Sequence, residues 1–296
     1  MSEETKGTVP AKVGVLGGGR MGAGIAHAFL ISGSNVTVVE ANPQAAAAAK
    51  ERIESDLAKS LERGKIDGNL DKWAENLSVS LEHSDFAECE LVIEAVPEIW
   101  DLKVSSLQQV EANLSENAWL ATNTSSLSVD GLAAELKRPE RFCGLHFFNP
   151  VPASKLVEIV IGQQTSDELQ KLTLEWVAGI GKTPVTVNDA PGFASSRLGV
   201  ALGLEAIRMV EEGVASAEDI DNAWCSVTST PWARSRSRTS WAWMCALASR
   251  STSNPSSAPA SHRRSSCATW SNAASWARNP ARASTTTRSL HSGSPA

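Results

Sequence analysis

The sequence predicts an α/β protein in which helices cover both faces of a mostly parallel β-sheet. The first observation is residues 12–40, which read as a short apolar strand, a glycine turn, an alanine-rich helix and a second apolar strand ending in an acid. This order is typical of a βαβ unit. The second observation is that strand-like and helix-like stretches go on alternating as far as residue 190, which indicates crossover connections between parallel strands. Together they predict a doubly wound sheet of the Rossmann type.

The elements after the first unit keep this alternation. Apolar strands are predicted at residues 77–81, 91–95, 118–122, 142–147 and around Glu158. Helices are predicted at residues 43–63 and 99–114, and residues 165–187 hold one further helix and strand. A Pro-Gly turn at Pro191 then introduces a long helix. We therefore expect a flexible leader at residues 1–11, the sheet domain at 12–190 and the start of a second domain at 191–223.

A glycine-rich turn joins the first strand to the first helix. Gly17, Gly19 and Gly22 fit the pattern G-x-G-x-x-G, in which the glycines permit a tight turn, backbone approach to a pyrophosphate and close packing of helix on strand. Glu40 ends the second strand, where a carboxylate accepts hydrogen bonds from both adenosine ribose hydroxyls and repels a 2′-phosphate. The pattern predicts an NAD site. The alternatives are a glycine turn with a purely structural purpose and a solvated acid at a strand end.

Ligands of open α/β sheets bind beyond the carboxyl ends of the strands. Five polar residues follow such ends and are predicted to line one crevice: Glu98, Lys103, Asn123, Ser125 and His146. His146 lies in GLHFFNP, and Glu158 follows 12 residues later in the apolar stretch SKLVEIV. Because the pKa of histidine lies near neutrality, His146 is a candidate general base that a carboxylate on the next strand would orient. A core histidine bonded to a carbonyl is the alternative. His27, on the helix after the glycine turn, has no comparable partner and is expected to be structural.

Composition excludes several classes of protein. Of the 27 Lys and Arg residues, 18 precede residue 224, where they are outnumbered by all 33 Asp and Glu residues; the folded part is therefore not expected to bind nucleic acid. No apolar run approaches the roughly 20 residues of a membrane helix, and the polar leader does not resemble a signal peptide. We expect a cytoplasmic protein. The five cysteines have no metal-ligand spacing, so Cys89 and Cys143 are predicted to be small buried residues and no metal is expected.

Five motifs in this order and spacing resemble the L-3-hydroxyacyl-CoA dehydrogenase family, in particular the bacterial 3-hydroxybutyryl-CoA dehydrogenases: GGGRMGAGIA, EAVPE, TNTSSL, HFFNPVPASKLVEI and DAPGF. The resemblance covers residues 12–223. It implies NAD-dependent oxidation of a (3S)-3-hydroxyacyl-CoA to the 3-oxoacyl-CoA, or the reverse, in fatty acid or butanoate metabolism. Two alternatives remain: a dinucleotide-binding remnant with impaired turnover, and a relative acting on free hydroxy acids or sugar acids.

The resemblance also implies roles for particular residues. His146 would be the general base and Glu158 its partner, while Ser125 and Asn149 would bind the hydroxyl or carbonyl oxygen of the acyl-CoA. The cofactor would be held by Glu98, Lys103 and Asn123 in addition to the glycine turn. One position departs from the family pattern PGF-x-x-N-R, because the sequence reads PGFASSR and Ser196 stands where the family has Asn. We do not assign that role to Ser196.

The last 73 residues, 224–296, differ in composition from the rest. They contain 19 Ser, 9 Arg and 6 Trp but no Lys, Asp or Glu. Trp and Met each have a single codon, and a reading frame displaced by one base at Ala223 permits MVLGYKHPMGPL, LVGLDV and GKKSGKGFYDY, which resemble the missing family segments. The sequence thus predicts a frameshift, a disordered tail and the loss of most of the family's helical substrate domain and homodimer interface. A genuine Ser/Arg-rich arm that binds nucleic acid or a membrane is the alternative.

Overall fold

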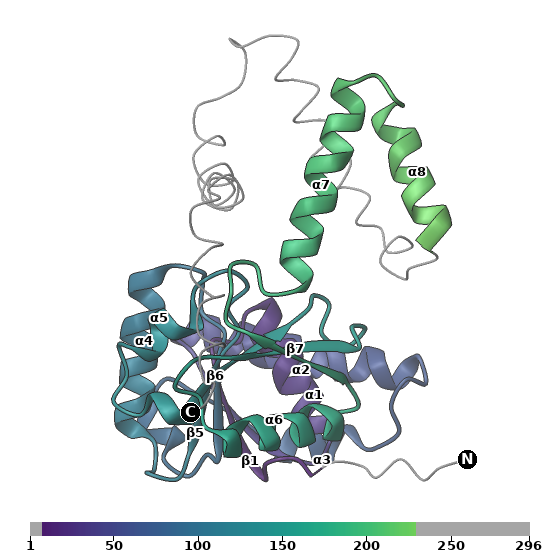
Figure 1. The fold of residues 1–296 in the computed structure, drawn as a ribbon. Coiled ribbons are helices and arrows are strands. Elements are labelled where there is room, and N and C mark those ends of the chain that lie inside the picture. Colours follow the sequence, from purple (N-terminus) through teal and green to yellow (C-terminus); the bar gives the residue numbers. More distant parts are fainter. Residues whose placement is uncertain (1–7, 229–296) are drawn as a thin grey trace, which may run out of the picture. The chain divides into compact units, whose positions relative to one another are not determined.

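An eight-stranded sheet forms the centre of the first part of the chain (Figure 1). The computed structural model describes residues 8–228, and the chain divides into two units, residues 1–196 and 197–296. The strands are β1 (Lys12–Leu16), β2 (Asn35–Val39), β3 (Leu77–Ser80), β4 (Leu91–Glu94), β5 (Trp119–Thr122), β6 (Phe142–Phe147), β7 (Leu156–Ile161) and β8 (Thr183–Asn188). Their order is β3-β2-β1-β4-β5-β6-β7-β8, and every neighbouring pair is parallel except β6 and β7. The predicted fold class is confirmed.

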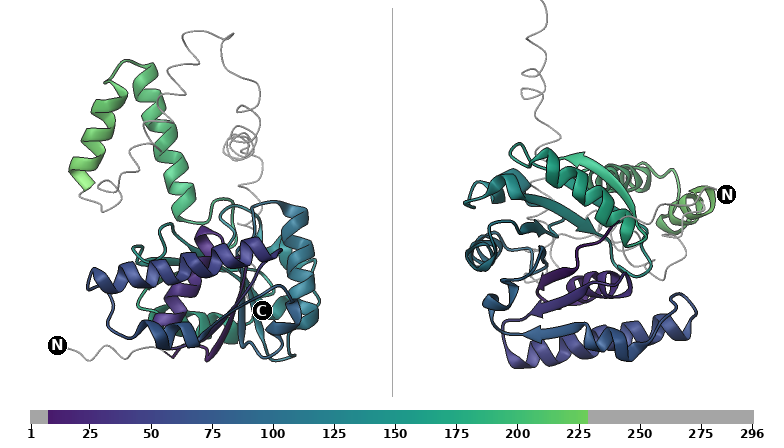
Figure 2. Two further views of the ribbon diagram at one scale, coloured as in Figure 1. Left: turned by 180° about the vertical axis from the view of Figure 1, so that it is seen from behind. Right: turned by 90° about the horizontal axis from the view of Figure 1, so that it is seen from below.

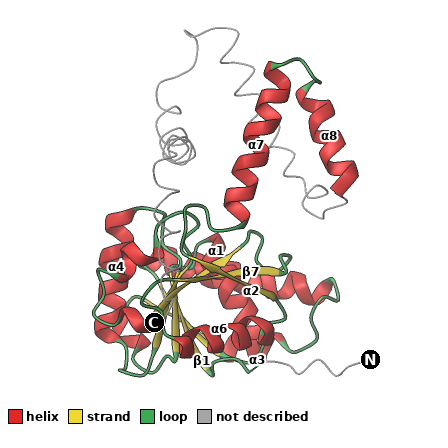
Figure 3. Ribbon diagram, viewed as in Figure 1, coloured by secondary structure: helices red, strands yellow, loops and turns green. Residues whose placement is uncertain are grey.

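Helices cover both faces of this sheet, as the views in Figures 2 and 3 show. They are α1 (Arg20–Ile31), α2 (Pro43–Glu62), α3 (Leu70–Glu75), α4 (Trp100–Asn113), α5 (Val129–Ala133) and α6 (Asp167–Gly179), with 3₁₀ turns at His83–Phe86 and Pro139–Arg141. One core cluster holds side chains of α1, α2, α3 and α6, and a second holds side chains of α4 and α5. Because β4 and β5 are buried along their whole length, their first three residues are all apolar rather than alternately apolar and polar.

The helices begin in two different ways. Asn42 caps α2 by accepting a hydrogen bond from the amide of Ala45, and Ser166 caps α6 through the amide of Leu169. At the start of α1 the N-cap is Gly19, and no side chain caps the helix. The first amides of α1 therefore remain available to an external acceptor.

The second unit contains most of α7 (Ser195–Glu211) together with α8 (Ala217–Thr228). Ala206 on α7 and Ile220 on α8 are the buried residues of a small apolar cluster. Beside it lies a groove of about 350 Å³, lined by Leu202, Glu205, Ala206, Met209, Ile220, Asp221, Ala223 and Trp224. Leu198 on α7 is 65% exposed.

The sequence predicted one helix in this second unit, whereas the residues described there, up to 228, form two. Helix α8 continues through Ala223 to Thr228, so the start of the predicted tail does not coincide with the end of a helix. The remainder of that predicted tail, 229–296, and the first seven residues of the leader lie outside the described residues. Within residues 8–228, no helix combines the length and apolar character needed to cross a bilayer, and no cluster of His, Cys, Asp and Glu could hold a metal ion.

Candidate active site

The predicted site residues gather at one edge of the sheet. β1, β4, β5 and β6 are parallel, so their carboxyl ends meet at that edge. The glycine turn follows β1, the EAVPE segment follows β4, the TNTSS segment follows β5 and His146 lies near the end of β6. The topology therefore brings four segments from separate parts of the sequence to the place of the predicted crevice.

The glycine turn has the geometry that an anionic ligand requires. Gly17 has a φ of +89°, and a Cβ atom there would lie 3.1 Å from the carbonyl oxygen of Ala95. A Cβ atom at Gly22 would lie 1.7 Å from the carbonyl oxygen of Gly17, whereas one at Gly19 would meet nothing within 4 Å. The space in front of the uncapped α1 is thus open, and a pyrophosphate there would accept hydrogen bonds from its first amides. These residues fit a dinucleotide such as NAD.

Glu40 lies against the same turn. Its Oε1 accepts a hydrogen bond from the amide of Gly18 at 2.6 Å. Arg52, on α2, donates from Nη1 to the carbonyl oxygen of Gly18 at 2.7 Å. Two side chains from different elements thereby fix the turn. Sequence reasoning identified Glu40 but missed Arg52, because an arginine in a polar helix carries no signal that distinguishes it from a solvated one.

A buried ion pair lies directly beneath the crevice. The ammonium of Lys103 is 2.7 Å from Oε1 of Glu94, and the two side chains are 1% and 0% exposed. Thr122 donates to the other carboxylate oxygen of Glu94 at 2.6 Å. Lys103 was expected to hold the cofactor, and in the structure its ammonium is enclosed by Glu94 and by Glu98, whose Oε2 lies 3.3 Å away. The sequence signal for Glu94 was an acid ending an apolar strand, and it was overlooked.

Glu98 organises the turn that follows β5. Its Oε1 accepts hydrogen bonds from the hydroxyl of Thr124 at 2.6 Å, the amide of Ser125 at 2.8 Å and the amide of Ser126 at 3.1 Å. Burial raises the pKa of Glu98, but the hydrogen bond from Thr124 and the charge of Lys103 outweigh it and bring the pKa below its ordinary value. The carboxylate therefore stays ionised and holds the turn on which Ser125 is exposed.

Asn123 connects this turn to the strand that carries His146. Its side-chain oxygen accepts a hydrogen bond from the amide of Phe147 at 2.9 Å. Asn149, two residues further along, is exposed. Among residues 8–228, neither Ser125 nor Asn149 has a hydrogen bond with His146, so the structure places these residues at one edge of the sheet without joining them.

His146 and Glu158 form a pair across the antiparallel strands β6 and β7. The two residues are directly opposite each other in the strand register, and Nδ1 of His146 lies 2.8 Å from Oε2 of Glu158. The histidine is 6% exposed and the glutamate 1% exposed. The rings of Phe148 and Phe193 pack against the imidazole, with centroid separations of 4.4 and 5.6 Å. This is the geometry in which a carboxylate orients an imidazole and stabilises its protonated form.

Glu158 has further donors that sequence reasoning missed. Its Oε1 accepts from the amides of Ala194 and Ser195, and its Oε2 accepts from the hydroxyl of Ser195 at 2.8 Å. Burial raises the pKa of Glu158, and the hydrogen bonds from His146 and Ser195 outweigh burial and lower it. In the described part of the chain the neighbouring Ser196, which attracted attention in the sequence, has no side-chain hydrogen bond.

Other polar and reactive groups lie away from this crevice. His27 is 2% exposed, bonds Ser60 through Nε2 at 3.0 Å and has a pKa lowered by burial. Burial raises the pKa of the Cys89 and Cys143 thiols to about 11 and about 12, so both are poor nucleophiles. These features fit the structural functions expected of them.

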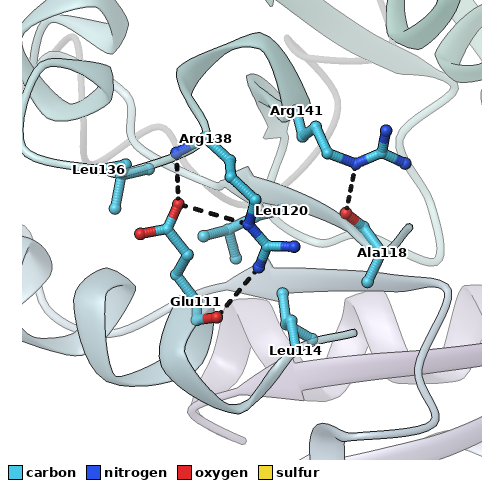
Figure 4. A pocket seen from close by; sticks show the side chains of 7 residues that line it. All are labelled: Glu111, Leu114, Ala118, Leu120, Leu136, Arg138 and Arg141. Carbon is cyan, nitrogen blue, oxygen red and sulfur yellow. Dashed lines mark hydrogen bonds and ion pairs between the residues drawn. The ribbon is translucent and has the colours of Figure 1, made fainter. Parts of the chain in front are cut away.

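A small hollow lies at the opposite edge, near the amino ends of β5 and β6 (Figure 4). It is lined by Glu111, Leu114, Ala118, Leu120, Leu136, Arg138 and Arg141, and its volume is about 10 Å³. The carboxylate of Glu111 accepts hydrogen bonds from the amides of Lys137 and Arg138. The space can hold no more than one water molecule. We therefore interpret these residues as a structural contact that joins α4 to the turn before β6.

Comparison with known proteins gives consistent matches along the chain. The family described as "3-hydroxyacyl-CoA dehydrogenase, NAD binding domain" matches residues 12–190, and the corresponding C-terminal domain matches residues 192–235. A probable 3-hydroxybutyryl-CoA dehydrogenase of Deinococcus radiodurans is 40% identical over 210 residues, which cover 71% of this chain and 76% of that protein.

Solved structures agree with these matches. The crystal structure of (S)-3-hydroxybutyryl-CoA dehydrogenase from Ralstonia eutropha superposes with a TM-score of 0.72 at 36% identity, covering 75% of this chain and 79% of that one. A diketoreductase described as acting on dicarbonyl compounds superposes with a TM-score of 0.70 at 30% identity, covering 76% and 81%.

Proposed function

The chain belongs to the 3-hydroxyacyl-CoA dehydrogenase family, and on that premise we propose that it oxidises (3S)-3-hydroxybutyryl-CoA to the 3-oxoacyl-CoA with NAD, or catalyses the reverse reaction. The observation that carries the proposal is the hydrogen bond between Nδ1 of His146 and the buried carboxylate of Glu158. It leaves Nε2 of the same ring as the nitrogen that can exchange a proton with substrate.

Residues of three segments would hold the cofactor. The glycine turn and the start of α1 would bind the pyrophosphate, and Glu40 would accept hydrogen bonds from the adenosine ribose in place of the amide of Gly18. When bound, NAD supplies the acceptor for the hydride that leaves C3 of the substrate. Glu98 holds the turn at Ser125, and Lys103 keeps Glu98 in place from below.

The proton of the substrate hydroxyl is transferred to His146. As the C3 hydroxyl of the substrate becomes a carbonyl, its proton passes to Nε2 of His146, while the hydrogen on Nδ1 stays on the ring and remains donated to Glu158. Glu158 already accepts four hydrogen bonds, so it remains a carboxylate and stabilises the imidazolium. Ser125 and Asn149 would donate hydrogen bonds to the substrate oxygen, positions that family resemblance supports.

The test compares the protein with the variant His146→Gln. We expect kcat for 3-hydroxybutyryl-CoA to fall by about 10²- to 10⁴-fold, the range for loss of a general base, while the Kd for NAD measured by fluorescence stays the same. Glu158→Gln keeps the shape of the pair and should reduce kcat to a smaller degree. A variant lacking His146 with the activity of the original protein would refute the assignment.

The same assay separates the alternative functions. NAD binding without turnover of any 3-hydroxyacyl-CoA would favour an impaired remnant. Turnover of free 3-hydroxybutyrate in preference to its thioester would favour a relative acting on free hydroxy acids, an alternative that the similarity to a diketoreductase keeps open.

A further inference from the structure

We propose that Ser195 is a positioning residue that sets the basicity of His146, because both residues donate hydrogen bonds to the same oxygen atom, Oε2 of Glu158. The inference rests on the proposed function in one respect, namely that His146 is the base of the reaction. The first turn of α7 would thus tune the base of the reaction, which neither the glycine turn nor the substrate-binding residues do.

The geometry divides the donors of Glu158 between its two oxygens. Oε2 accepts from Nδ1 of His146 at 2.8 Å and from Oγ of Ser195 at 2.8 Å. Oε1 accepts from the amide of Ser195 at 2.7 Å and from the amide of Ala194 at 3.1 Å. Because Glu158 is 1% exposed, water does not compete for either oxygen. The number and direction of protein donors therefore decide how much negative charge faces the imidazole.

The donors from α7 weaken the acceptor that His146 uses. A hydroxyl or amide hydrogen bonded to a carboxylate draws its charge away from other partners, and the start of a helix adds the positive end of the helix dipole. A carboxylate without these donors would stabilise the imidazolium of His146 more strongly. The base would then be protonated, and inactive for oxidation, over a wider range of pH. Ser195 thus limits how strongly Glu158 stabilises the protonated ring of His146.

Few other groups can produce such an effect. In the described part of the chain, Glu158 on β7 is the charged group in contact with His146, and the remaining ring contacts are the uncharged Phe148 and Phe193. Phe193 comes from the same turn as Ser195 and has a left-handed backbone, with a φ of 49°. Such a conformation is uncommon for an aromatic residue, and it lets one turn supply both a ring contact to His146 and a hydroxyl to Glu158.

Three variants of the whole chain test the proposal. Ser195→Ala removes the shared hydroxyl, and Ser195→Thr retains a hydroxyl at the same place. Ser166→Ala is the matched control, since it removes a helix-capping hydroxyl from α6, on an element outside the crevice. The pKa of His146 is measured by NMR titration of its ring, assigned with His146→Gln, and the pH dependence of kcat/KM is recorded beside it.

We expect Ser195→Ala to raise the pKa of His146 by about half to one unit, which lowers kcat/KM by about threefold to tenfold on the acid side of the profile. Ser195→Thr and Ser166→Ala should leave the titration of His146 where it was. The proposal is overturned if the pKa is unchanged or falls in Ser195→Ala, or if Ser195→Thr behaves like Ser195→Ala. A raised pKa by NMR with an unchanged kcat/KM profile would support the inference and refute His146 as the base.

Discussion

Replacing Lys103 by Met tests whether the ion pair beneath the crevice holds the fold together or serves the cofactor. The side chain of Lys103 is 1% exposed, and its ammonium lies 2.7 Å from the fully buried Glu94 and 3.3 Å from Glu98. Met has a similar length and no charge, so the substitution removes the positive charge with little change in volume. Glu94 is then left as a buried carboxylate without its counter-ion.

The structure sets the size of the effect. Removing one partner of a buried ion pair costs about 3–5 kcal/mol. We expect the lower end, about 3 kcal/mol, since Glu94 keeps hydrogen bonds from the amide of Val96 at 2.7 Å and the hydroxyl of Thr122 at 2.6 Å. Domains of this kind unfold with about 5–15 kcal/mol, so the variant should fold with reduced stability. The double variant Lys103→Met/Glu94→Gln removes both charges and should recover about half of the loss.

Urea unfolding measures the free energies, and fluorescence titration measures the Kd for NAD in the same proteins. If Lys103 acts through the fold, the double variant should recover cofactor affinity along with stability. Direct contact between Lys103 and the cofactor, as first expected from the sequence, would leave the double variant weak in NAD binding even after stability returns. A cost below about 1 kcal/mol for Lys103→Met would refute the reasoning, because it would show that no uncompensated charge is left inside.

Three further predictions concern single residues. Glu40→Ala should raise the Kd for NAD by about tenfold to a hundredfold and improve binding of NADP, through loss of hydrogen bonds to the ribose and of repulsion of a 2′-phosphate; equal affinities before and after would contradict it. Gly22→Ala should abolish NAD binding, measured by the same titration, since its Cβ would lie 1.7 Å from the oxygen of Gly17. Burial lowers the pKa of Lys182 from 10.5 to about 8. Between these two pH values the unfolded chain binds more protons than the folded chain, so the free energy of unfolding should rise with pH by at most about 3 kcal/mol. Urea unfolding of Lys182→Met should lack this rise.

The sheet and the glycine turn could be predicted from the sequence because their signals are local. Each strand of the first βαβ unit is a short apolar run, and each glycine serves a conformation or a close approach within a few residues. The pairing of His146 with Glu158 was also accessible, since both lie in apolar strands that follow one another in the chain. Their antiparallel register, which places the two residues opposite each other, was not, because nothing in either strand fixes it.

Contacts between distant segments could not be predicted in this way. Lys103 follows the EAVPE segment at a helical spacing that allows its side chain to point toward the crevice or beneath it, and only packing decides between them. Similarly, Ser195 and Ser196 are chemically the same, and the first turn of α7 determines which hydroxyl reaches Glu158. The family pattern drew attention to Ser196 because such a pattern records residue types and not the direction in which each side chain points.

The frameshift after Ala223 remains a prediction of the sequence. Helix α8 runs across that position to Thr228, and the family match extends to residue 235. Sequencing the gene around the Ala223 codon tests the hypothesis directly. An additional base there would restore an in-frame helical domain, whereas an unchanged sequence would favour a genuine Ser/Arg-rich segment.

Two carboxylates organise the candidate site from opposite sides. Glu98 accepts hydrogen bonds from the turn that carries Ser125, and Glu158 accepts hydrogen bonds from His146 and from the turn that carries Ser195. Hydrogen bonds outweigh burial at both and lower their pKa. The stability that each contributes is therefore complete above its ordinary pKa of about 4.5 and is lost as pH falls through the lowered value. It follows that acid should disorder both turns together, although no hydrogen bond joins them, because each depends on the ionisation of its own carboxylate.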